Sequence, residues 1–165
     1  MPSIYIETSI VSYLTAWPMH NLIAAAHQAL TRDWWDQRRE HFELFASELV
    51  IQEASQGDTD AARRRLEALT GVAILSATPD VQSIAVELFR SGLVPANAAA
   101  DAAHIAFASV YRIDFLLTWN CKHIANAERL PAIKQFLSAR GMFVPNVCTP
   151  EELMGDVDSL NQESA

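Results

Sequence analysis

The stretch AAADAAHIAFASVYRIDFLLTWN, residues 98–120, decides the fold class. Its first part, Ala98–Arg112, is apolar almost all round, which predicts a helix that lies deep in the protein. Its second part, Phe115–Thr118, is a short continuous apolar run, typical of a strand that is buried on both faces of a parallel sheet. Asp101 stands in the first turns of the predicted helix and Asn120 follows the predicted strand, so polar groups lie near the ends of two buried elements.

Strands and helices alternate in the same way along the rest of the chain. The predicted strands are Ile4–Ile6, Phe42–Phe45, Val72–Leu75, Phe115–Thr118 and Asn146–Cys148. A first helix is predicted to begin at a cap formed by Thr8 or Ser9 and to end at Leu14, and another begins at a Ser47 cap and contains Glu53. The other predicted helices are Asn21–Arg39, Asp58–Leu69, Val81–Phe89, Ala98–Arg112 and Pro131–Arg140. This alternation predicts an α/β fold, in which helices cover both faces of a central parallel sheet. We expect one domain over residues 1–155 and a polar tail over 156–165.

Composition excludes several classes of protein. The 165 residues include 20 Asp and Glu against 12 Lys and Arg, a formal net charge of −8, which excludes a protein that coats nucleic acid through a basic surface. Cys121 and Cys148 lie far apart in the sequence, which predicts two reduced thiols rather than a zinc site. The sequence shows neither a signal-peptide pattern nor an apolar run long enough to span a bilayer, so we expect a cytoplasmic protein.

Ligands of parallel sheets bind beyond the carboxyl ends of the strands, so polar residues at those ends are the candidates for a site. Glu7 follows the first predicted strand and Asn120 the fourth, while Asp101 opens the deep helix and Glu53 interrupts an apolar helical stretch. Three carboxylates that lie close together raise each other's pKa, and a divalent cation removes that repulsion. An all-oxygen set of ligands suits Mg²⁺ or Mn²⁺, which can activate water and neutralise the charge of a phosphodiester.

Each of these four residues also has a purely structural interpretation. Asp101 is well placed to stabilise the helix dipole as an acid in the first turn. Glu53 can extend into solvent from the end of its helix. Glu7 can pair with an arginine or cap a helix, and Asn120 can serve as an ordinary turn residue.

Three more side chains are candidates for contact with a substrate. His104 follows Asp101 by three positions and shares its helix face, although a histidine packed in the core is the competing interpretation. Lys122 and His123 follow Asn120 closely and together could meet a phosphate group. The basic run at residues 63–65 is more typical of a solvated helix face than of a nucleic-acid interface.

In this order the candidate residues resemble the motifs of a PIN-domain ribonuclease of the VapC toxin type. The resemblance runs from Ile4 to about Met154, and four segments carry it: Tyr5-Ile6-Glu7-Thr8-Ser9, Ser47–Glu53, Asp101–Ala108 and Leu116–Asn120. Two positions depart from the usual pattern. Glu7 stands where the family usually has Asp, and Asn120 offers a neutral oxygen where an acid is common.

The resemblance implies a three-layer α/β/α PIN-like fold and a Mg²⁺- or Mn²⁺-dependent endoribonuclease that prefers single-stranded RNA. It implies that the cation is held by Glu7, Glu53, Asp101 and Asn120, and that Thr8, Ser9 and Thr118 orient the carboxylates and water. It also implies a homodimer and, often, a cognate antitoxin. The two departures keep a second interpretation open, a catalytically silent PIN-like module that binds a protein partner or RNA. A phosphotransferase is disfavoured, because the sequence has no glycine-rich phosphate loop.

Overall fold

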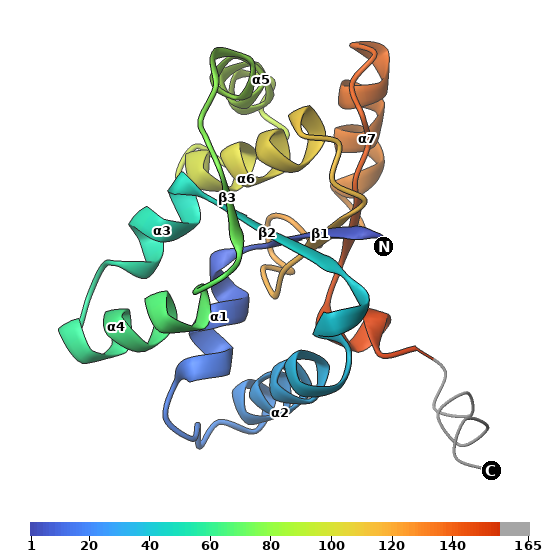
Figure 1. Ribbon diagram of the computed structural model, residues 1–165. Helices are drawn as coiled ribbons and strands as arrows, with labels where there is room; N and C mark the ends of the chain where they lie inside the picture. The colour runs from blue at the N-terminus through green and yellow to red at the C-terminus, as the bar shows by residue number, and fades with distance from the viewer. Residues whose placement is uncertain (156–165) are drawn as a thin grey trace.

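The computed structural model describes residues 1–155, and the polar tail expected over 156–165 lies outside this range. Its sheet is parallel throughout (Figure 1). The strands are β1 (Ser3–Ile6), β2 (Glu43–Ser47), β3 (Ala73–Leu75), β4 (Phe115–Leu117) and β5 (Asn146–Cys148). They lie side by side in the order β3-β2-β1-β4-β5. The chain therefore builds outward from β1 to β3 and then returns to place β4 on the free side of β1, which makes the β1–β4 pair the point where the strand order reverses.

Helices cover both faces of the sheet, as the alternating pattern predicted. The helices are α1 (Thr8–Thr15), α2 (Leu22–Gln37), α3 (Glu48–Ala54), α4 (Thr59–Ala68), α5 (Pro79–Arg90), α6 (Ala99–Val110) and α7 (Leu130–Ala139), with short 3-10 turns η1 (Arg39–His41) and η2 (Pro150–Leu153). Figure 1 shows α5, α6 and α7 on one side of the sheet and α1, α2 and α4 on the other. This arrangement confirms the predicted α/β fold with a central parallel sheet.

Two local predictions were wrong. The cap of α1 is neither Thr8 nor Ser9 but Glu7, whose carboxylate accepts a hydrogen bond from the backbone N–H of Ser9 at 2.8 Å. The second strand was expected at Phe42–Phe45 and lies at Glu43–Ser47. It continues to Ser47 because the register with β3 carries it two residues beyond the apolar run.

The central strand β1 and the helix α6 form the middle of the core. Ile4, Tyr5 and Ile6 have no solvent exposure, in keeping with a strand buried on both faces. Of the eight positions 102–109 of α6, all but Ala103 are buried: Ala102, His104, Ile105, Ala106, Phe107, Ala108 and Ser109. The apolar helix predicted from residues 98–112 is therefore deep in the protein, and it positions Asp101 at its outer end.

Two features of the structure concern the sequence-based predictions about the thiols and about membrane-spanning segments. Cys121 and Cys148 are both free thiols, one exposed and one buried, and burial raises the pKa of Cys148 to about 12. Across residues 1–155, no helix combines the length and the apolar character that crossing a membrane requires.

Candidate functional site

The candidate site lies at the carboxyl ends of β1 and β4, where the strand order reverses. Ile6 and Leu117 are register partners in this strand pair. The backbone N–H of Glu7 donates to the carbonyl of Leu117 at 3.1 Å, so the strands stay paired up to the point where the site begins. Glu7 and Thr118 therefore leave the sheet side by side, in the place where open α/β sheets usually bind their ligands.

Glu7 is buried, with 6% of its surface exposed, and one of its carboxylate oxygens accepts every hydrogen bond that the side chain makes. Oε2 accepts from the backbone N–H of Ser9 at 2.8 Å, from the Ser9 hydroxyl, and from the Thr118 hydroxyl at 3.1 Å. Within residues 1–155 no Lys or Arg pairs with Glu7, and Oε1 carries no hydrogen bond. A buried carboxylate thus keeps one oxygen free for a further partner.

Asp101 is held by residues that follow β4. Asn120 donates from its amide nitrogen to Oδ1 of Asp101 at 3.0 Å, and Nδ1 of His123 lies 2.9 Å from Oδ2. The amide oxygen of Asn120 accepts the backbone N–H of His123 at 3.0 Å, and its backbone N–H donates to Thr118 Oγ1 at 2.9 Å. Since the Thr118 hydroxyl donates to Glu7, a continuous series of hydrogen bonds joins Glu7 to Asp101.

Glu53 belongs to a second hydrogen-bond network, which is formed with Thr8, His104 and Tyr5 and is separate from the bonds of Glu7 and Asp101. Its Oε1 accepts the Thr8 hydroxyl at 2.6 Å and lies 2.7 Å from Nε2 of His104. Burial on its own would raise the pKa of Glu53, but its hydrogen-bonding and electrostatic interactions with His104, together with the hydrogen bond from Thr8, outweigh burial and lower the pKa. His104 is 1% exposed, and its other ring nitrogen lies 2.7 Å from the Tyr5 hydroxyl. Glu53 therefore neither extends freely into solvent nor bonds directly to Glu7 or Asp101.

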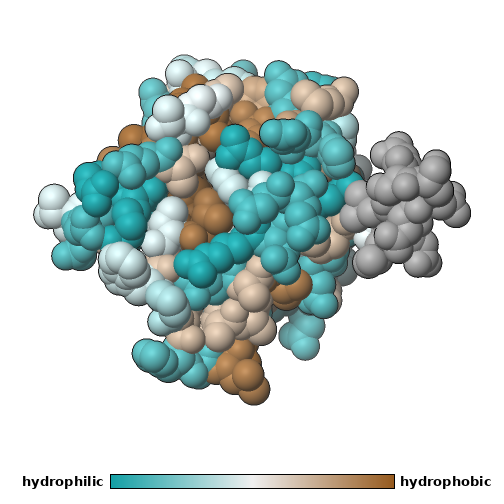
Figure 2. Space-filling view, turned by 60° about the horizontal axis from the view of Figure 1, so that its bottom comes forward, coloured by the Kyte–Doolittle hydropathy of each residue, from teal (hydrophilic) through white to brown (hydrophobic). Residues whose placement is uncertain are grey.

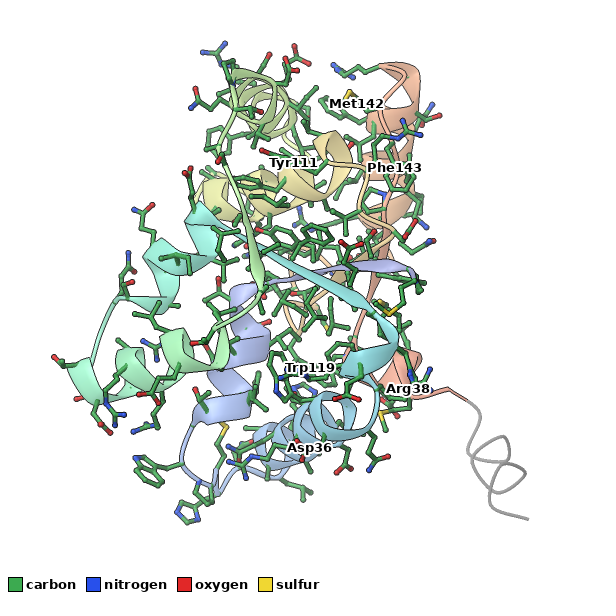
Figure 3. All side chains as sticks on the ribbon, viewed as in Figure 1. Asp36, Arg38, Tyr111, Trp119, Met142 and Phe143 are labelled. Atoms are coloured by element: carbon green, nitrogen blue, oxygen red, sulfur yellow. The ribbon has the colours of Figure 1, made fainter. Side chains whose placement is uncertain are left out.

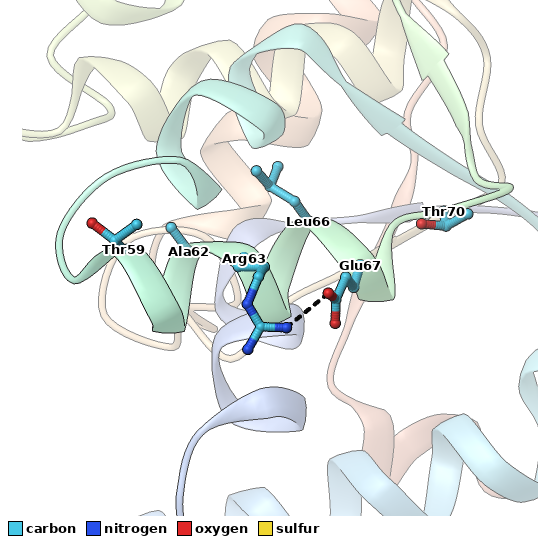
Figure 4. A pocket seen from close by; sticks show the side chains of 6 residues that line it. All are labelled: Thr59, Ala62, Arg63, Leu66, Glu67 and Thr70. Carbon is cyan, nitrogen blue, oxygen red and sulfur yellow. Dashed lines mark hydrogen bonds and ion pairs between the residues drawn. The ribbon is translucent and has the colours of Figure 1, made fainter.

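The remaining candidates lie nearer the surface. Lys122 is exposed, and His123 keeps 18% of its side chain exposed beside Asp101. Of the basic run at 63–65, Arg63 is exposed between Asp60 and Glu67, with contacts of 2.6 and 2.8 Å, as expected for a solvated helix face. Arg64 and Arg65 are half-buried and donate to backbone carbonyls outside α4. A shallow cavity of about 610 Å³ follows this part of α4 (Figure 4), but none of the candidate site residues lines it.

Sequence reasoning missed the residue that anchors the loop after β4. Trp119 stacks on His27 with ring centroids 3.9 Å apart, and its indole N–H donates to Thr31 at 2.7 Å, which fixes the loop to α2 (Figure 3). Its backbone N–H donates to the Ser9 hydroxyl at 2.9 Å, which links the loop to α1 as well. No spacing rule identifies such an anchor, although its place between Thr118 and Asn120 is a signal that could have been used.

The side chains at the strand ends are of the type that binds a hard divalent cation, but they are not gathered into a coordination group. In residues 1–155, no three His, Cys, Asp or Glu side chains gather into a metal-binding group. Two carboxylates and an amide, from Glu7, Asp101 and Asn120, are nevertheless joined through Thr118. Oxygen donors of this kind suit Mg²⁺ or Mn²⁺, and a cation would compensate the unpaired buried charge of Glu7.

The comparisons with known proteins agree with this geometry at the level of the fold. No family model and no curated protein matches the sequence. Among solved structures, the crystal structure of VapC20 of Mycobacterium tuberculosis, a Sarcin-Ricin loop cleaving toxin, matches with a TM-score of 0.52 and 17% identity. The match covers 69% of this chain and 87% of that one. The chain has a VapC-like PIN fold.

The PIN-like fold that the four sequence motifs implied is thereby confirmed. At 17% identity the likeness carries the fold alone, so the roles of the site residues rest on their own chemistry. The assignments of Glu7, Glu53, Asp101 and Asn120 as cation ligands stay predictions. So do the supporting roles of Thr8, Ser9 and Thr118 and the contact with substrate expected of His104, Lys122 and His123.

Proposed function

We propose that this protein is a metal-dependent endoribonuclease that hydrolyses phosphodiester bonds in RNA. The observation that carries the proposal is the hydrogen-bonded link between Glu7 and Asp101, at the point of a PIN-like fold where the strand order reverses. The structural neighbour described as a Sarcin-Ricin loop cleaving toxin supports RNA as the class of substrate. The negative net charge of −8 fits an enzyme that needs a cation beside its polyanionic substrate.

Glu7, Asp101 and Asn120 would hold Mg²⁺ or Mn²⁺, with Glu53 contributing from the second network. When bound, the cation supplies a Lewis acid that polarises a phosphate oxygen and promotes loss of a proton from water. Ser9 and Thr118 fix one oxygen of Glu7 and leave its Oε1 free. A side chain held in this way needs little rearrangement to bind a ligand, which favours both affinity and rate.

The exposed edge of the site carries groups that suit a phosphate. Lys122 offers an ammonium group in solvent, and the His123 ring is partly exposed while Asp101 holds its Nδ1 side. Donors of this kind bind phosphate oxygens through charge-assisted hydrogen bonds. We therefore place the RNA backbone along the turn at residues 120–123, beside the proposed cation ligands.

Cleavage of mixed RNAs by the purified protein in Mn²⁺ tests the proposal directly. We expect wild type to cleave and Asp101→Asn to lose at least about 100-fold in rate, since even residues that only support metal ligands are worth about 10–100-fold. Asp80→Asn is the matched control, because Asp80 also lies in the first turn of a helix, α5, but is exposed. Equal cleavage by wild type and Asp101→Asn would contradict the proposal.

One observation favours a second candidate, a catalytically silent module that binds a protein or RNA. Both carboxylate oxygens of Asp101 already face hydrogen-bonding partners, Asn120 and His123, so a cation would have to share or displace them. Calorimetric titration with Mn²⁺ separates the two candidates. Binding by wild type that is lost in Asp101→Asn supports the nuclease, whereas negligible binding by both, together with no cleavage, supports the silent module.

We also infer, from the resemblance to VapC toxins, a homodimer, a cognate antitoxin and a cytoplasmic location. Light scattering on the purified protein tests the dimer. A small reading frame directly upstream that encodes a DNA-binding protein would support an antitoxin. If no such frame exists, a solitary nuclease becomes the better interpretation.

A further inference from the structure

A buried series of hydrogen bonds runs from the core of the sheet to Glu53. It passes from Ser47 to Tyr5, from Tyr5 to His104, and from His104 to Glu53. We infer that His104 is a positioning residue: Tyr5 and Ser47 hold its ring as the tautomer with the proton on Nε2, and that proton fixes one oxygen of Glu53 and leaves the other free. The role of Glu53 rests on the proposed function, but the tautomer is a property of the protein without any cation.

The direction of the series is set by Ser47, which has no solvent exposure. Its hydroxyl oxygen accepts the backbone N–H of Val50 at 3.2 Å, as the cap of α3. In residues 1–155 the one other hydrogen-bond partner of this oxygen is the Tyr5 hydroxyl, at 2.7 Å. Buried hydroxyl protons are nearly always paired, so the Ser47 proton points to the Tyr5 oxygen.

Tyr5 then has one place left for its own proton. Its oxygen accepts from Ser47, and the remaining partner within the described residues is Nδ1 of His104, at 2.7 Å. A tyrosine hydroxyl carries its proton at neutral pH, so this proton must be donated to one of its two partners. Nδ1 of His104 is therefore an acceptor, and in a neutral imidazole the other nitrogen, Nε2, carries the hydrogen.

The Nε2–H of His104 points to Oε1 of Glu53, at 2.7 Å. Because Oε1 also accepts the Thr8 hydroxyl at 2.6 Å, two donors from two helices hold the same oxygen. Oε2 of Glu53 carries no hydrogen bond within residues 1–155 and is the oxygen left for a cation. His104 is 1% exposed, so its effect on a reaction passes through Glu53 rather than through substrate.

The opposite arrangement leaves a buried proton without a partner. A doubly protonated His104 would donate from Nδ1 to Tyr5, and Tyr5 would then donate to Ser47. The Ser47 oxygen would accept from both Tyr5 and Val50, and its own proton would have no acceptor within residues 1–155. An unpaired buried donor is costly, so the hydrogen bonds favour a ring that accepts at Nδ1 and donates from Nε2.

Nitrogen NMR of the full chain with ¹⁵N-labelled histidine, recorded at pH 7 without divalent ions, tests the tautomer. We expect a pyridine-type signal for Nδ1 of His104 and a pyrrole-type signal for Nε2, assigned by their absence in His104→Gln. In Tyr5→Phe the Nδ1 signal should shift, because its donor is gone. Two pyrrole-type nitrogens, or a proton on Nδ1, would overturn the inference.

The positioning role is tested with a pair of variants at His104. Glutamine can donate from its amide nitrogen to Glu53 and accept from Tyr5 with its oxygen, whereas leucine can do neither. We expect His104→Gln to keep kcat within a few-fold of wild type, and His104→Leu to lose about 10–100-fold in kcat with little change in KM. A folded His104→Leu with wild-type kcat, or no rescue by glutamine, would overturn the role.

Tyr5→Phe keeps the role testable if His104→Leu fails to fold, because it removes only the hydroxyl that orients the ring. We expect a reduced kcat and a shifted tautomer equilibrium, and wild-type values of both would contradict the inference. Failure of the proposed function is distinguishable from failure of this inference. Wild type that cleaves no RNA counts against the nuclease, while the NMR spectrum still decides whether Tyr5 and Ser47 fix the His104 proton.

Discussion

The two ends of the β1–β4 strand pair are closed by the same kind of bond. At the amino end, the carboxylate of Asp114 accepts the backbone N–H of Ser3 at 2.8 Å and the Ser3 hydroxyl at 2.9 Å. At the carboxyl end, the carboxylate of Glu7 accepts a backbone N–H and a hydroxyl of Ser9, together with the hydroxyl of Thr118. In both places a carboxylate on one strand accepts a hydrogen bond from a hydroxyl group on the other, Ser3 at Asp114 and Thr118 at Glu7.

The two ends differ in burial and in what lies beyond the carboxylate. Asp114 is only partly buried, and within residues 1–155 its carboxylate accepts hydrogen bonds from Ser3 alone. Glu7 is 6% exposed and is linked through Thr118 and Asn120 to a second carboxylate, Asp101. One carboxylate is therefore enough to join the ends of two strands. A cation site needs in addition that this carboxylate is buried, keeps one oxygen free and lies near a second acid.

The largest effect expected from this difference is on cleavage of RNA. Glu7→Gln removes a charged ligand but keeps the shape of the side chain, so we expect a loss of at least about 100-fold in rate in Mn²⁺. Asp114→Asn makes the matching change at the other end and should cleave within about two-fold of wild type, since supporting roles near the metal are absent there. Similar losses in both variants would show that Glu7, like Asp114, affects cleavage through the stability of the fold rather than through a role at the site.

A second effect is on stability, at the hydroxyl groups of the two ends. Thr118 is fully buried and serves both Glu7 and the backbone of Asn120, so Thr118→Val should cost about 2 kcal/mol in the free energy of unfolding. Ser3→Ala removes a hydroxyl at the more exposed end and should cost about 1 kcal/mol or less. Urea denaturation monitored by circular dichroism measures both. Equal costs would mean that burial does not distinguish the two ends.

The strands and most of the helices could be predicted from the sequence because they are local patterns. The run Asn146–Cys148 was predicted with the bounds that the structure shows, and Ala98–Arg112 was expected where α6 spans Ala99–Val110. The wrong end of β2 has a different origin. Pairing of Ala46 and Ser47 with β3 continues that strand, and such pairing joins residues nearly thirty positions apart, which no local pattern reveals.

The site was predictable only as far as the strand ends. Glu7 and Asn120 could be expected near each other, because the carboxyl ends of parallel strands meet at one edge of a sheet. The partners of each carboxylate could not be foreseen. Glu53 and His104 are 51 positions apart and Tyr5 and His104 are 99 apart, so their bonds depend on how helices pack on the sheet. Packing also buries His104, which agrees with the interpretation of a histidine packed in the core that the sequence left open beside contact with a substrate.

A third effect concerns binding of a divalent cation. At a Mn²⁺ concentration ten times its dissociation constant, a single site stabilises the folded protein by about 1.4 kcal/mol. We expect this stabilisation in wild type and in Asp114→Asn, and none in Glu7→Gln, measured as a shift of the thermal midpoint with and without a chelator. A shift in Glu7→Gln as large as that of wild type would place the cation away from the strand ends.

The smallest effect is on the pH dependence of stability at the amino end. The backbone and side-chain hydrogen bonds from Ser3 lower the pKa of Asp114 below its usual value. A carboxyl group whose pKa is lowered by folding contributes stability above its unfolded pKa of about 3.9, and loses that contribution as the pH falls through the lower, folded value. Asp114→Asn should therefore be less stable than wild type at pH 6 by under about 1 kcal/mol, because the group is well solvated.

The difference between wild type and Asp114→Asn should shrink as the pH falls from 5 towards 2, since protonation removes from wild type what the substitution has already removed. Urea midpoints across this range, with Ser3→Ala measured in parallel, provide the check. A difference that stays constant with pH would mean that the Asp114 charge is not what closes the amino end. The two ends of the β1–β4 pair would then share only the geometry of their hydrogen bonds, and the charge of the carboxylate would not contribute to stability at the amino end.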